Sequence, residues 1–94
     1  MNEKCCQVLQ ALSDPTRLKI LHQLKKQEKC VSAICTCFDI TQPSVSHHLD
    51  ILKRAGLVKS RKEGREVYYS YNGDMIIECC GMQFNALDIV IQKK

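Results

Sequence analysis

The sequence has no long hydrophobic run, no internal repeat and no low-complexity segment. No stretch approaches the ~18–20 apolar residues that a membrane-spanning helix requires. Residues 1–6 are polar and charged, and they lack the apolar segment of a secretory signal peptide. We therefore expect a cytoplasmic protein that does not use a membrane as a partner.

Aromatic residues are scarce, with three tyrosines, two phenylalanines and no tryptophan, although 45% of the residues are hydrophobic. This composition predicts a core of aliphatic side chains. A chain of 94 residues has room for one domain, which we expect to span residues 1–94. So small a core is marginal in a monomer, and the surplus of aliphatic residues favours a dimer. The net charge of +4 is compatible with phosphate binding but does not prove it.

Seven cysteines are many for this length. An odd number, in a chain with no signal-peptide pattern, argues against the disulfide framework of a small secreted protein. We therefore expect reduced thiols, which serve in the cytosol as core residues, metal ligands or redox sensors.

The apolar spacing predicts four successive helices, at about 2–12, 15–26, 31–38 and 41–56. Asp14 and Thr41 are expected to cap the second and fourth helices, with Pro15 and Pro43 in the first turns. Gly56 is expected to end the fourth helix.

After Gly56 the spacing of apolar residues changes from that of a helix to that of strands. Residues 57–61 and 66–71 are rich in strand-forming residues, and Gly64 between them provides the positive φ of a hairpin turn. A last helix is expected at about 75–92. Its apolar residues cover so wide an arc that more than one side of the helix must be buried, and a dimer interface is the simplest way to bury it.

This order of elements predicts a mainly α (α+β) winged helix-turn-helix fold. The helix-turn-helix unit would span about 31–56 and the hairpin, or wing, about 57–71. The fourth helix carries hydrogen-bonding side chains on the face opposite its apolar stripe, namely Gln42, Ser44, Ser46, His47 and His48. Glutamine can bond bidentately to adenine, and serine and histidine can reach base edges or phosphates.

Taken alone, such a face could also be an ordinary solvated surface. The wing, however, adds three cations, Arg61, Lys62 and Arg65, which suit phosphates or the minor groove. Because the polar helix and the basic hairpin follow one another directly, we predict that the protein binds double-stranded DNA.

The sequence resembles the ArsR/SmtB family of metalloregulatory repressors in three stretches, Ala11–Leu21, Gln42–Val58 and Arg61–Tyr69. These stretches follow the family's order and together span nearly the whole chain. The resemblance implies a homodimeric winged helix joined through its first and last helices, here about 2–12 and 75–92. It also implies binding to operator DNA without metal and release when a metal ion binds.

The family senses ions at several places. Its zinc-type site uses histidine and carboxylates on the last helix, and this chain has no histidine there. Its arsenic-type site resembles a Cys-Val-Cys-x-x-Cys run. Cys30 and Cys35 match that run, but Ser32 stands at the middle position. Cys37 adds a thiol, so Cys30, Cys35 and Cys37 form one alternative set, and Cys35 and Cys37 are equally well explained as core residues.

Two vicinal pairs, Cys5–Cys6 and Cys79–Cys80, form the preferred set. Some arsenic-responsive members of the family are similar in using such a pair near the N-terminus or on the last helix. We expect Cys79 and Cys80, with help from Cys5, Cys6 or Cys30, to bind As(III), or alternatively Cd(II) or Pb(II), since thiolates select soft ions. No organic cofactor is expected. The alternative is that Cys5 and Cys80 only fill core positions on the apolar faces of their helices.

Three rival functions remain. The cysteines could sense redox state or persulfide on the same fold, although the second helix carries His22 where such relatives carry a cysteine. A cysteine enzyme is disfavoured because no nucleophile elbow or glycine-rich loop accompanies any cysteine. A winged helix that only binds proteins would lack salt-dependent DNA binding.

Overall fold

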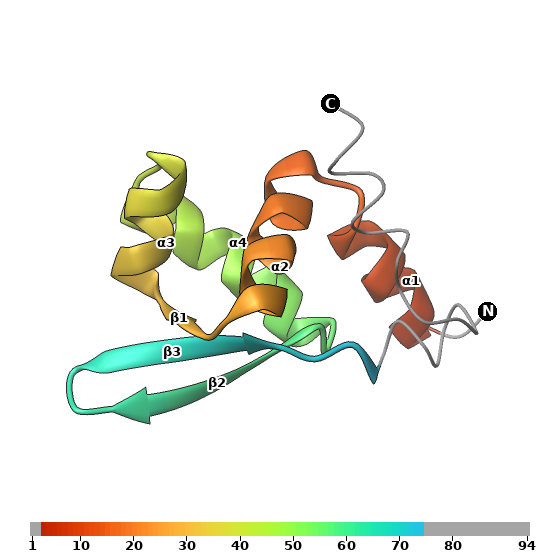
Figure 1. Cartoon of the computed structure of the whole chain (residues 1–94). Helices are drawn as coiled ribbons and strands as arrows, with labels where there is room; N and C mark the ends of the chain where they lie inside the picture. The colour runs from red at the N-terminus through yellow and green to blue at the C-terminus, as the bar shows by residue number, and fades with distance from the viewer. Residues whose placement is uncertain (1–2, 75–94) are drawn as a thin grey trace.

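The computed structural model describes residues 3–74 of the chain. In order, these residues form α1 (Glu3–Ala11), α2 (Pro15–Lys26), β1 (Lys29–Cys30), α3 (Val31–Phe38), α4 (Gln42–Arg54), β2 (Val58–Glu63) and β3 (Glu66–Tyr71), as Figure 1 shows. The expected last helix at about 75–92 lies outside the described residues, and so do Cys79 and Cys80.

The helix boundaries follow the local signals of the sequence. The side chain of Asp14 accepts a hydrogen bond from the Arg17 N–H at 3.0 Å, and the Thr41 hydroxyl accepts one from the Ser44 N–H at 3.4 Å. Both satisfy backbone donors that a helix start leaves unpaired, so both predicted caps are confirmed. Gly56, with φ of 82°, ends α4 as predicted.

The core is aliphatic, as the composition predicts, and it lies between the helices and the sheet. Its fully or almost fully buried residues are Val8, Ala11, Ile20, Leu21, Leu24, Ile34, Val45, Leu49, Leu52, Ala55, Leu57 and Val58. The apolar residues of α1 are not all buried in the core, because Val8 is buried whereas Leu9 is 46% exposed. An apolar side chain of this size therefore faces outward from the first helix.

The sheet has one strand more than predicted. The two residues of β1 pair antiparallel with β3, and the strand order within residues 3–74 is β1-β3-β2. The wing lies where it was predicted, but its first strand extends further along the chain, because Lys62 and Glu63 belong to β2 rather than to the turn. The turn consists of Gly64 and Arg65, with φ of 62° at Gly64, as in a two-residue hairpin with glycine first.

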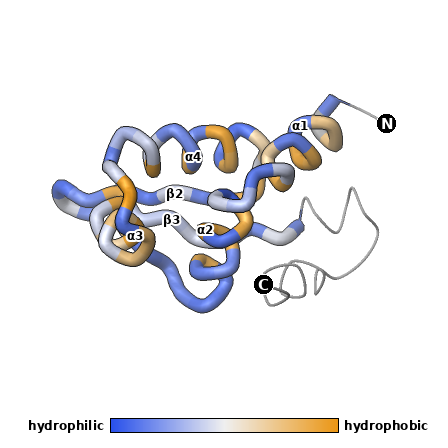
Figure 2. Tube along the Cα trace, turned by 90° about the horizontal axis from the view of Figure 1, so that it is seen from above, coloured by the Kyte–Doolittle hydropathy of each residue, from blue (hydrophilic) through white to orange (hydrophobic). Residues whose placement is uncertain are grey.

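The hairpin of β2 and β3 projects beyond the helices, and its tip lies at the opposite end of the molecule from α1 in both views (Figures 1 and 2). Its tip is hydrophilic, whereas hydrophobic residues are concentrated on the helices (Figure 2). Among the helices formed by residues 3–74, none has the length and apolar character needed to cross a bilayer.

Candidate nucleic-acid interface

Helices α3 and α4 form a helix-turn-helix whose connection is only three residues long. Asp39 takes a left-handed conformation, with φ of 56° and ψ of 45°, and its N–H donates to the Cys35 carbonyl at 2.8 Å. The Thr41 cap and Pro43 then start α4 at once. The short connection fixes the direction in which α4 leaves α3.

The inner face of α4 is fully buried through Val45, Leu49 and Leu52. The predicted DNA-contacting residues occupy the rest of its surface, but not all in the same way. Gln42, Ser46 and His47 are exposed, whereas Ser44 and His48 are half-buried. The exposed surface near the start of α4 therefore offers uncharged donors and acceptors, which suit base edges.

His48 faces the N-terminal end of α2 rather than open solvent. Its Nδ1 lies 3.3 Å from Nη1 of Arg17 and 4.0 Å from the Asp14 carboxylate, and its side chain is 16% exposed. Burial lowers the pKa of His48 below its usual value, the Asp14 carboxylate opposes this change, and the charges of Arg17 and His47 add to it.

The wing presents its cations in two ways. Lys62 and Arg65 are exposed, and neither forms an ion pair with a residue that the structure describes. Arg61 instead donates to both carboxylate oxygens of Glu28 at 2.8 Å and also bonds Glu63. Its guanidinium lies over the ring of Tyr68, 4.9 Å from the centroid.

The Arg61–Glu28 pair links the wing to the segment between α2 and β1. The hydrogen bonds from Arg61 lower the pKa of Glu28, and those to Glu28 and Glu63 raise the pKa of Arg61. Arg61 was predicted only as a DNA contact. The structure shows that it also holds the wing to Glu28. Glu28 was missed, because it lies 33 residues away and no local pattern joins the two.

The predicted cysteine ligands do not come together within residues 3–74, where no group of three or more histidine, cysteine or acidic residues could hold a metal ion. In the third-helix set, Cys35 is half-buried against the core and Cys37 is exposed. The half-buried Cys30 has its Sγ 3.2 Å from the Ser32 hydroxyl. Cys5 is half-buried and Cys6 exposed on α1.

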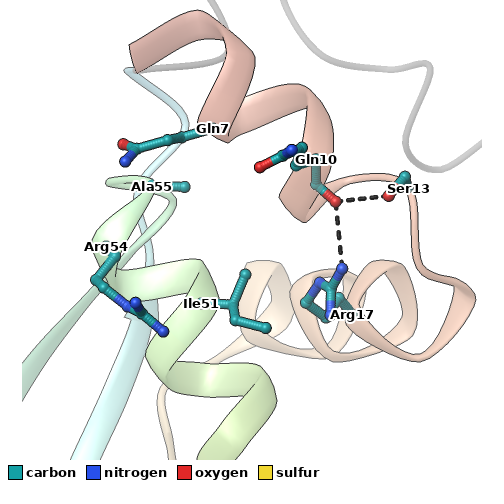
Figure 3. Close-up of a pocket in the computed structure, with 7 residues that line it drawn as sticks. All are labelled: Gln7, Gln10, Ser13, Arg17, Ile51, Arg54 and Ala55. Atoms are coloured by element: carbon teal, nitrogen blue, oxygen red, sulfur yellow. Dashed lines mark hydrogen bonds between the residues drawn. The ribbon is translucent and has the colours of Figure 1, made fainter. Parts of the chain in front are cut away.

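A pocket of about 390 Å³ is lined by residues of α1, the start of α2 and the C-terminal half of α4 (Figure 3). Its lining residues are Gln7, Gln10, Ser13, Arg17, Ile51, Arg54 and Ala55. Sequence reasoning missed Arg17, whose guanidinium donates to the carbonyls of Gln10 and Ala11 at 3.2 and 2.8 Å. A basic residue inside a predicted helix gives no sign of such contacts.

The family described as bacterial regulatory proteins of the arsR family matches residues 14–60, which contain α2, the helix-turn-helix and the start of the wing. The chain belongs to this family. The predicted resemblance is therefore confirmed. Members of the arsR family are DNA-binding transcriptional regulators and not enzymes, so the cysteine-enzyme alternative is set aside.

Individual relatives extend the match. Transcriptional repressor SdpR of Bacillus subtilis is 38% identical over 81 residues, which are 86% of this chain and 90% of SdpR. A homolog of the cadmium resistance transcriptional regulatory protein CadC from Staphylococcus aureus is 41% identical over 70 residues, which are 73% of this chain and 58% of that relative.

Among solved structures, one similar fold is the homodimeric winged helix-turn-helix DNA-binding domain of a possible ArsR-family transcriptional regulator from Mycobacterium bovis. Its TM-score is 0.78 at 29% identity, over 97% of this chain and 81% of that one. The predicted winged helix-turn-helix fold is confirmed by this similarity and by the observed elements.

Proposed function

We propose that this arsR-family protein is a cytoplasmic repressor that binds a two-fold symmetric operator as a homodimer and releases it when a thiophilic ion binds. One observation carries the DNA-binding part. An exposed, uncharged hydrogen-bonding face on α4, held by a short helix-turn-helix connection, is followed in the chain by a wing with the exposed cations Lys62 and Arg65.

The two parts of this surface have different roles. Gln42, Ser44, Ser46, His47 and His48 of α4 contact base edges and adjoining phosphates. Lys62 and Arg65 contact phosphates or the minor groove, and Arg61 joins them while it positions the wing through Glu28. Base contacts provide specificity, and phosphate contacts provide affinity and register.

The homodimer is supported by the outward-facing Leu9 on α1 and by the broadly apolar sequence at about 75–92. The similar structure from Mycobacterium bovis is itself homodimeric. In a dimer, the two copies of α4 would lie about one helical turn of DNA apart, ~34–36 Å, to enter successive major grooves.

For the inducer we propose As(III), with Cd(II) and Pb(II) as alternatives, bound by Cys79 and Cys80 with Cys5, Cys6 or Cys30. Thiolates suit soft ions, and one relative is named for cadmium resistance. Since no three ligands come together within residues 3–74 of one chain, the site needs Cys79 and Cys80 or a second copy of the chain.

The DNA-binding part is tested with duplexes selected by the protein from a random-sequence pool. Fluorescence anisotropy should show tighter binding to a selected duplex than to its scrambled version. Affinity for both should fall as salt rises, with a log–log slope of several units. No salt-dependent binding to either duplex would contradict the proposal and favour a protein-binding winged helix.

The inducer part is tested by adding arsenite, and separately cadmium and lead, to the preformed complex. Arsenite should release the DNA, and Cys79→Ser/Cys80→Ser should abolish the release. Cys35→Ser/Cys37→Ser is the matched control, and loss of release in this variant alone would assign the third-helix set instead. Release only by polysulfide, with a mass increase on cysteine, would replace the ion by a persulfide signal.

A further inference from the structure

Arg17 joins three parts of the protein through one side chain. Its Nε donates to the Ala11 carbonyl at 2.8 Å and its Nη2 to the Gln10 carbonyl at 3.2 Å. Its Nη1 lies 3.3 Å from Nδ1 of His48. Figure 3 shows Arg17 of α2 below the C-terminal end of α1, next to Ile51 of α4.

The contact between Arg17 and His48 fixes the protonation of the imidazole ring. A guanidinium has five N–H donors and no acceptor, so Nδ1 of His48 must be the acceptor in this hydrogen bond. The ring is then neutral, and its one proton is on Nε2. The Nε2–H points away from Arg17, because the two nitrogens lie on different sides of the ring.

We propose that Arg17 is a positioning residue for DNA recognition, which holds His48 of α4 as the neutral Nε2–H tautomer. The inference rests on the proposed function, because it assumes that α4 contacts DNA. In this tautomer His48 is a hydrogen-bond donor, so it selects an acceptor on DNA. That acceptor is either a phosphate oxygen or a base-edge atom such as guanine O6 or N7.

The same side chain also connects α4 to α1. The Gln10 and Ala11 carbonyls lie at the C-terminal end of α1, where helix carbonyls have no partner within the helix. One guanidinium therefore bonds the end of α1 through Nε and Nη2 and contacts His48 of α4 through Nη1.

Burial is the main influence on the ring of His48 and lowers its pKa, which favours the neutral form. The Asp14 carboxylate, 4.0 Å from Nδ1, opposes this by raising the pKa, and the smaller influences of Arg17 and His47 lower it. When acid protonates Nδ1, the ring can no longer accept from Arg17 and can donate to Asp14 instead. Nε2 keeps its proton in the imidazolium, so acid removes the Arg17 contact that positions the ring but not the donor proposed to bind DNA.

The first test is nitrogen NMR of histidine-labelled protein without DNA. At pH 7 the wild type should show His48 neutral, with Nδ1 unprotonated and a pKa below 6.5. This result depends on no substitution. A protonated ring, or an Nδ1–H tautomer, would overturn the inference even if the protein binds DNA.

The second test compares Arg17→Gln with Lys26→Gln, which removes one exposed charge from the same helix. Arg17→Gln should raise the pKa of His48, mix its tautomers and weaken binding to the selected duplex by about tenfold, the loss expected for one hydrogen bond to a charged group. Lys26→Gln should change none of the three. Equal effects in both variants would reduce Arg17 to a surface charge and overturn the inference.

Two further variants complete the test. Arg17→Lys keeps the charge but cannot supply three donors in a fixed fork, so it should restore little of the lost affinity. If Arg17→Gln does not fold, Arg17→Lys provides the same comparison. His48→Phe separates the two acceptors, since equal weakening on selected and scrambled duplexes indicates a phosphate, and selective weakening indicates a base edge.

Failure of the inference and failure of the proposed function give different results. If the wild type binds no selected duplex, the proposed function fails, and the NMR result still stands alone. If the wild type binds DNA but His48 does not have the Nε2–H tautomer, only the inference fails.

Discussion

Helix α4 and the wing would contact the same DNA, yet they differ in chemistry and in how they are held. The outer face of α4 is mostly uncharged near its start, and three fully buried side chains hold the helix on the core. The wing tip is charged, and an exposed pair between Arg61 and Glu28 holds the wing to the α2–β1 segment.

This difference follows from what each contact requires. A bidentate hydrogen bond to a base depends on position, so the helix that makes it must be mounted rigidly. Attraction to phosphates acts over several ångströms and tolerates small displacements, so a hairpin held by a surface ion pair is sufficient. Substitutions in α4 and in the wing should therefore have different effects on stability, specificity and salt dependence.

The largest effect on stability is expected when the packing of α4 on the core is disrupted. Leu49→Ala removes a fully buried side chain from the middle of its inner face and should lower the free energy of unfolding by about 2–5 kcal/mol. Thermal denaturation followed by circular dichroism should show a fall in Tm on the order of 10 °C, with loss of DNA binding. Lys53→Ala, exposed on the same helix, should leave Tm nearly unchanged, and a similar fall there would contradict this assignment.

The next effect is loss of specificity through α4. Gln42→Ala should weaken binding to the selected duplex by roughly 5- to 150-fold, the range for one bidentate base contact, and leave the scrambled duplex almost unaffected. Anisotropy at a single salt concentration measures both. Gln27→Ala, an exposed glutamine away from α4, is the matched control. Equal weakening on both duplexes would show that Gln42 does not contact a base.

The wing should affect all DNA alike. Lys62→Gln/Arg65→Gln should weaken both duplexes by the same factor and reduce the steepness of the salt dependence by about two units, near 0.9 for each lost phosphate contact. The double variant Lys19→Gln/Lys26→Gln removes the same charge from α2 and serves as the control. An unchanged slope in the wing variant would place its cations away from the phosphates.

The smallest effect is expected from the tether of the wing. The pKa of Glu28 is lowered by Arg61, so this pair contributes stability above pH 4.5 and loses it as the pH falls through the folded-state pKa. Glu28→Gln should therefore have a slightly lower Tm than wild type at neutral pH, and the two values should converge in acid. A difference that persists or grows in acid would show that Glu28 does not act through its charge.

The helix-turn-helix could be predicted from the sequence because its signals are local. Thr41, Pro43 and Gly56 mark the ends of α4, and the apolar spacing gives its buried face. The bounds predicted for α2 and α3 agree with the structure. The strand β1 was missed, since two residues have no periodicity and depend on pairing with Tyr68 and Tyr69.

The candidate site was predictable only in part. Sequence patterns identify which side chains on α4 and the wing are polar, but not which ones find partners within the fold. Arg61 was predicted as a DNA-contacting cation and lies against Glu28, and His48 was predicted as a DNA-contacting residue and lies against Arg17. Both partners are about 30 residues away in the chain, at 33 and 31 residues, where no local pattern operates.

The central claim is that α4 specifies the sequence and the wing supplies affinity for phosphates. One salt titration tests it most directly, with the selected and scrambled duplexes, on wild type, Gln42→Ala and Lys62→Gln/Arg65→Gln. The account predicts that the helix variant loses the selected-over-scrambled ratio and keeps the salt slope. The wing variant should keep the ratio and lose about two units of slope. If both variants change the ratio and the slope together, or if wild type binds neither duplex, the account is wrong.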